Sequence, residues 1–77
     1  MNVHGFKITD EQQNACILAM KKRFKASDIE LVAILAGVPR YHDRDGIAHR
    51  VADRIIQRQR KDGKIKRDGN HWLPNVI

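Results

Sequence analysis

Residues 46–61 carry the pattern that most constrains the fold of this chain. Advancing each residue by about 100°, as in an α-helix, separates the segment into an apolar side and a polar side. The apolar side holds Ile47, Ala48, Val51, Ala52, Ile55 and Ile56. The polar side holds Arg50, Asp53, Arg54, Gln57 and Lys61, with His49, Arg58 and Arg60 at its flanks. Such a helix needs other elements over its apolar side and leaves a basic side in solvent.

An earlier helix is predicted to begin after Thr9. Thr9 and Gln12 have the spacing of a capping box, in which a hydroxyl and an amide side chain satisfy backbone N–H groups at the helix start. An apolar stripe at helical spacing follows, made of Gln13, Cys16, Ile17, Met20 and Phe24. Lys21, Lys22 and Arg23 are then expected in the last turn, where cations suit the helix dipole.

A second helix is predicted from Ser27, because Ser27 and Glu30 form another capping-box pattern. Residues 29–36 are apolar around most of the helix circumference, so this helix is expected to be largely buried. Gly37 and Pro39 end it. Residues 38–45 are expected to form a loop, with Asp43 or Asp45 capping the third helix.

The segment after Gly63 predicts a β-hairpin. Asp68 and Gly69 suit a tight two-residue turn, which would place Arg67 opposite Asn70 and Ile65 opposite Trp72. Strand alternation then directs Ile65 and Trp72 towards the core. Lys64, Lys66 and His71 would lie on the other face, and Pro74 ends the second strand.

A chain of 77 residues predicts one domain, here an α+β domain of three helices and a C-terminal hairpin over residues 9–77, preceded by a short arm over residues 1–8. Phe6 and Ile8 of the arm are available to pack on the core. Charge is uneven, because residues 1–39 carry a net +1 and residues 40–77 a net +5. This asymmetry suggests a polyanionic partner, although a solvated lysine-rich surface would show the same excess.

Catalytic and metal-binding chemistry find little support in the sequence. His4, His42, His49 and His71 lack ligand spacing, and Cys16 stands alone on an apolar stripe. We see no glycine-rich phosphate loop and no nucleophile with an obvious base. The chain is therefore expected to be a non-enzyme without cofactor or metal. No apolar run is long enough to span a membrane, no secretory signal is evident, and a cytoplasmic location is expected.

The order of the elements resembles the winged helix-turn-helix family. The resemblance is carried by residues 25–29, 33–38, 51–55 and 61–67, followed by a turn and Trp72. In that family the third helix enters the DNA major groove and the wing contacts the backbone or the minor groove. The resemblance therefore implies a duplex DNA-binding protein, such as a small transcriptional regulator of the kind carried by phages and prophages.

The candidate DNA-binding residues follow from the two basic elements. Arg50, Arg54 and Gln57 carry donors of the kind that read base edges. Arg44 and the start of the third helix can hold a phosphate, and the hairpin cations can neutralise others. The complete set is Arg44, His49, Arg50, Arg54, Gln57, Lys61, Lys64, Lys66, Arg67 and Asn70.

A protein-interaction module of the same shape is the alternative. Its candidate surface is the second face of the first helix, with Ala15, Leu18 and Ala19. The same face offers a possible homodimer contact, which would reconcile the two interpretations.

Overall fold

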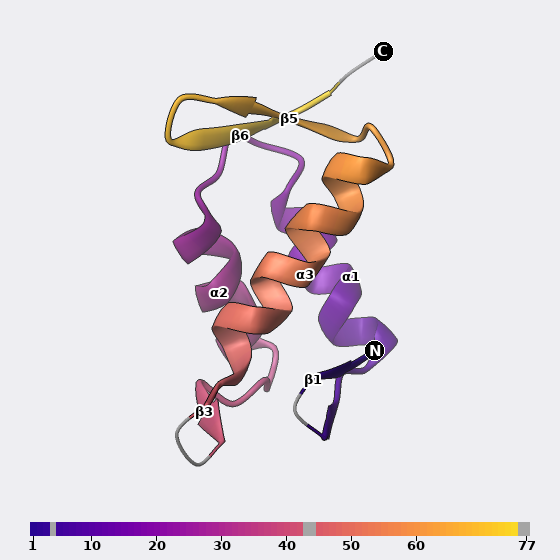
Figure 1. Ribbon diagram of the computed structural model, residues 1–77, viewed down its shortest axis with the longest axis vertical. Helices are drawn as coiled ribbons and strands as arrows, with labels where there is room; N and C mark the ends of the chain where they lie inside the picture. Colours follow the sequence, from indigo (N-terminus) through magenta and orange to yellow (C-terminus); the bar gives the residue numbers. More distant parts are fainter. Residues whose placement is uncertain (4, 43–44, 76–77) are drawn as a thin grey trace.

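The computed structural model describes residues 1–3, 5–42 and 45–75 and is an α+β domain. Its three helices are α1 (Asp10–Ala19), α2 (Ala26–Leu35) and α3 (Ile47–Lys61). An antiparallel hairpin of β5 (Ile65–Asp68) and β6 (His71–Pro74) follows and lies across the end of the bundle where α3 ends (Figure 1). The predicted fold class is confirmed, and the arrangement is winged-helix-like.

The core forms around the apolar side of α3. All six apolar residues predicted there are buried, and Gln59 is buried with them. The other helices contribute Cys16 from α1 and Ile29 and Ala33 from α2. The faces of α3 are therefore as its periodicity predicts, with the polar side left outward.

The capping box of α1 is confirmed. Thr9 Oγ1 accepts a hydrogen bond from Gln12 N at 3.2 Å, and Gln12 Oε1 accepts one from Thr9 N at 3.0 Å. The predicted end of the helix is wrong, because α1 ends at Ala19 and residues 21–23 lie beyond it. The chain leaves the helix there so that Phe24 can pair with the hairpin.

The predicted cap of α2 is wrong by two residues. Lys25 is the N-cap, and Asp28 Oδ2 accepts a hydrogen bond from its backbone N–H at 2.9 Å, while Ser27 lies inside the helix. The helix is also less buried than predicted. Leu31 and Leu35 are 52% and 79% exposed. Among the described residues, α1 and α3 pack against α2 and leave these two leucines exposed.

The predicted loop before α3 contains two short paired strands, β3 (Tyr41–His42) and β4 (Asp45–Gly46). The N-cap of α3 is Gly46. Backbone carbonyls take the place of a capping side chain, because Ile47 N donates to Arg40 O at 2.9 Å and Ala48 N to Pro39 O at 3.1 Å. The alternative cap Asp43 lies outside the described residues.

The hairpin forms as predicted, but its register is shifted. Arg67 pairs with Trp72 and Ile65 with Pro74, so the turn residues are Gly69 and Asn70. Gly69 has a φ of 60° and supplies the positive φ that a tight hairpin turn needs at its first central position. A shift of two residues keeps each side chain on its predicted face, which is why Ile65 and Trp72 are still buried.

A further pair of hydrogen bonds joins the hairpin to the segment between α1 and α2. Phe24 N donates to Trp72 O at 3.0 Å, and Trp72 N donates to Phe24 O at 2.7 Å. β6 is thus held by β5 on one edge and by Phe24 on the other.

The N-terminal arm packs on the core as predicted, since Ile8 is buried and Phe6 is half-buried against it. The arm also forms a hairpin that the sequence did not predict. Its strands are β1 (Asn2–Val3) and β2 (Phe6–Lys7), and Val3 is fully buried. This N-terminal hairpin lies beside α3.

Candidate nucleic-acid interface

The polar side of α3 presents a band of cations. Arg50, Arg54 and Lys61 are exposed, Gln57 is half-buried, and the flanking residues His49, Arg58 and Arg60 are exposed. Asp53 is the only acidic residue among Ile47–Lys61. The structure therefore brings together on one helix five of the predicted contact residues, namely His49, Arg50, Arg54, Gln57 and Lys61.

Three arginines of α3 are anchored by neutral acceptors. Arg54 Nη1 donates to Asn2 O at 2.8 Å, Arg58 Nη1 to Gln13 Oε1 at 3.5 Å, and Arg60 Nε to Gln57 Oε1 at 2.8 Å. Among the described residues, no carboxylate forms an ion pair with these guanidinium groups. These acceptors orient the guanidinium groups without neutralising them, although Asp53 and Asp62 lie on the same part of the surface.

A hollow of about 410 Å³ lies between α3 and the start of the chain, and we call it the α3–β1 hollow. Its lining is Met1, Asp53, Arg54, Gln57, Arg58, Lys61 and Asp62. Sequence reasoning missed this feature, because the contact between Asn2 and Arg54 joins positions 52 residues apart.

A second hollow of about 350 Å³ lies at the start of α3, lined by Gly46, His49, Arg50 and Asp53. His49 Nδ1 is 3.7 Å from Glu30 Oε2 of α2, which turns this imidazole towards α2. Asp53 lines both hollows and thus divides the polar side of α3 into two halves.

The hairpin adds exposed cations beyond the end of α3. Lys64, Lys66, Arg67 and Asn70 are all exposed. Arg67 folds back on its own hairpin: its Nε donates to Gly69 O at 2.8 Å, and its guanidinium carbon is 5.3 Å from the centre of the Trp72 ring. This cation–π arrangement fixes the guanidinium and leaves its terminal N–H groups open to a ligand.

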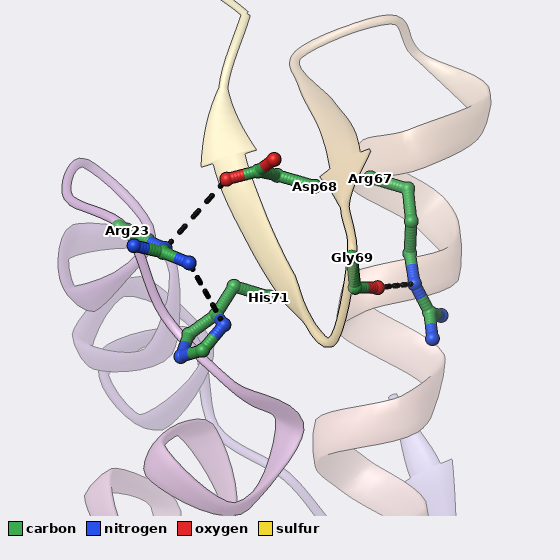
Figure 2. A network of polar contacts seen from close by, with 5 residues as sticks. All are labelled: Arg23, Arg67, Asp68, Gly69 and His71. Atoms are coloured by element: carbon green, nitrogen blue, oxygen red, sulfur yellow. Dashed lines mark hydrogen bonds and ion pairs between the residues drawn. The ribbon is translucent and has the colours of Figure 1, made fainter.

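The opposite flank of the hairpin carries a polar network with Arg23 (Figure 2). Arg23 Nε is 3.7 Å from Asp68 Oδ2, and its terminal nitrogen Nη2 is 3.2 Å from His71 Nδ1. Arg23 thus lies against the acidic residue nearest the hairpin turn. Sequence analysis placed Arg23 in a helix and did not find this role.

Arg44, the remaining predicted contact residue, lies outside the described residues. Apolar side chains on two other helices are exposed: Leu18 on α1, as predicted, and Leu31 and Leu35 on α2, which were predicted to be buried. Over the described ranges, the structure shows no group of three or more metal-ligating side chains. Within those ranges, no helix combines the length and apolarity needed to cross a membrane.

Comparisons of the chain with protein-family models, with curated proteins and with solved structures find no match.

Proposed function

We propose that this protein binds duplex DNA through the polar side of α3 and the β5–β6 hairpin and acts as a transcriptional regulator. The observation that carries the proposal is the composition of α3, which buries one side completely and presents five cations and one carboxylate on the rest. An exposed, strongly basic helix followed by a basic hairpin is the electrostatic footprint of a nucleic-acid-binding surface.

The two elements have different roles in this proposal. Arg50 is exposed in the first half of α3 and can donate two hydrogen bonds to a guanine edge in the major groove. Lys64 and Lys66 are exposed on the hairpin and can neutralise phosphates. The Asp53 carboxylate would repel a phosphate. It is compatible with bound DNA only where it accepts a hydrogen bond from a base amino group or lies away from the phosphates.

The proposal is tested with a duplex selected by the protein from a random pool and with an unselected duplex. Arg50→Ala should cost about 1–3 kcal/mol on the selected duplex and reduce the preference for it. Lys66→Ala should weaken binding to both duplexes equally. Equal effects of the two variants on both duplexes would contradict base reading by α3.

Protein interaction is the second candidate function, and the exposure of Leu31 and Leu35 on α2 favours it. Exposed leucines on one helix are common at contacts with another chain. Leu18 on α1, 62% exposed, supplies the face proposed for a homodimer. Sedimentation of the wild type and of Leu18→Ser or Leu35→Ser tests this candidate, since only an interface residue changes the oligomeric state.

A further inference from the structure

The α3–β1 hollow is lined by three cations of α3, two of which are hydrogen-bonded to other parts of the chain. On one side, Arg54 is tied to the carbonyl of Asn2 at 2.8 Å, which locks its guanidinium against the N-terminal hairpin. Arg58 is steadied by Gln13 of α1. Lys61 completes the set one turn further along α3 and is exposed. These three cations come to the hollow from one flank of the helix.

The acceptors that hold these arginines are neutral, so the guanidinium groups keep their positive charge for an anionic ligand. A carboxylate partner would cancel the guanidinium charge, whereas a carbonyl or amide oxygen orients the group and leaves the charge available. Arg54 and Arg58 each use one donor in these bonds, so several N–H groups of each remain for a ligand.

The lining favours an anion. The side chains of Arg54, Arg58 and Lys61 provide three positive charges against the two negative charges of Asp53 and Asp62. A phosphodiester, which carries one negative charge, is attracted by this excess of cations. Because a guanidinium fork fits two phosphate oxygens at once, the arginines also suit its geometry.

We infer that the α3–β1 hollow binds a phosphodiester group of the DNA backbone, with Arg54 as a phosphate ligand. This inference rests on the proposed function. The first half of α3, where Arg50 lies, would then contact the bases, and the second half would contact the DNA backbone. The N-terminal hairpin is then the positioning element that holds Arg54 in place. Asp53, which lines both hollows, marks the boundary between the halves.

The experiment measures binding of an unselected duplex at several salt concentrations by fluorescence anisotropy. Arg54→Gln and Lys61→Gln alter the hollow. Lys22→Gln is the matched control for Lys61→Gln, because Lys22 is an exposed lysine that lies outside α3 and the β5–β6 hairpin and does not line the hollow. Thermal unfolding of each variant checks the fold, and Lys61→Gln removes no hydrogen bond seen among the described residues.

Each hollow variant should reduce the slope of log affinity against log salt by about one unit, as expected for one lost phosphate contact. The control should leave the slope unchanged. If the hollow variants keep the wild-type slope on the unselected duplex, the inference is wrong and Arg54 is not a phosphate ligand. If the wild type itself shows no salt-dependent binding, the proposed function fails as well, so the two failures are distinct.

Discussion

At the scale of single residues, Trp72 connects the hairpin to the rest of the molecule. It is 7% exposed, pairs with Arg67 across the hairpin, and exchanges two backbone hydrogen bonds with Phe24. Sequence analysis predicts its burial correctly and its partner wrongly. The turn position decides the partner, and a two-residue change in register leaves the buried face the same.

Trp72→Ala should therefore destabilise the protein by about 3 kcal/mol or more, as expected when a large core side chain is removed. Urea denaturation followed by circular dichroism measures this change. Tyr41→Ala is the control, since its side chain is 64% exposed and surface substitutions usually change stability by less than about 0.5 kcal/mol. A Trp72→Ala variant of wild-type stability that has lost only its DNA affinity would contradict the core assignment.

Cys16 gives a pH-dependent prediction. Its side chain is buried in α1, and desolvation by burial raises the pKa of the thiol. The folded protein therefore keeps a proton that the unfolded chain releases, so the free energy of unfolding contributed by Cys16 falls as pH rises through the ordinary thiol pKa.

The stability advantage of the wild type over Cys16→Ala should consequently shrink at alkaline pH, as measured by urea denaturation across a pH series. Alkylation by iodoacetamide supplies an independent check. The native thiol should react much more slowly than the thiol in denaturant, because only the exposed thiolate is nucleophilic. Equal reaction rates in the two conditions would show that Cys16 is not buried.

At the scale of elements, periodicity predicts α3 well, and local capping patterns predict helix starts less reliably. Thr9 caps α1 as its sequence indicates, while Ser27 shows the same pattern and does not cap α2. The helix begins earlier because Asp28 satisfies the backbone N–H of Lys25. The sequence offers two competing caps there, and the local pattern alone does not decide between them.

Paired alanine variants test this difference. Thr9→Ala should cost about 1 kcal/mol, because it removes the acceptor for Gln12 N. Ser27→Ala should be nearly neutral, since Ser27 lies exposed inside α2 and alanine favours helix. Thermal denaturation of both variants measures these changes in stability. A larger loss of stability for Ser27→Ala than for Thr9→Ala would contradict the structure and indicate that Ser27 is the N-cap of α2.

The partial exposure of α2 also depends on the rest of the fold and not on its own sequence pattern. Its residues 29–36 are apolar enough to be surrounded, but α1 and α3, the helices that pack against it in the described part of the chain, leave Leu31 and Leu35 exposed. The apolar composition of a helix indicates how much of its surface can be buried. How much is buried in the folded protein depends on how many other elements pack around it.

At the scale of the whole molecule, the sequence predicts that α3 and the hairpin share a basic character, and the structure adds how the cations are held. Asn2 with Arg54, and Arg23 with Asp68, are contacts between distant positions. No periodicity or local motif encodes such pairs, because they depend on how the two terminal hairpins pack. The α3–β1 hollow depends on such long-range packing, because the start of the chain lies against α3 there.

The central claim, duplex DNA binding by this basic surface, is tested most directly by the affinity of the wild type for an unselected duplex across a salt series. If the α3–β1 hollow and the three hairpin cations Lys64, Lys66 and Arg67 each neutralise one phosphate, log affinity should fall linearly with log salt with a slope of about −3 to −4. Absence of binding at low salt, or an affinity that does not change with salt, would contradict the claim.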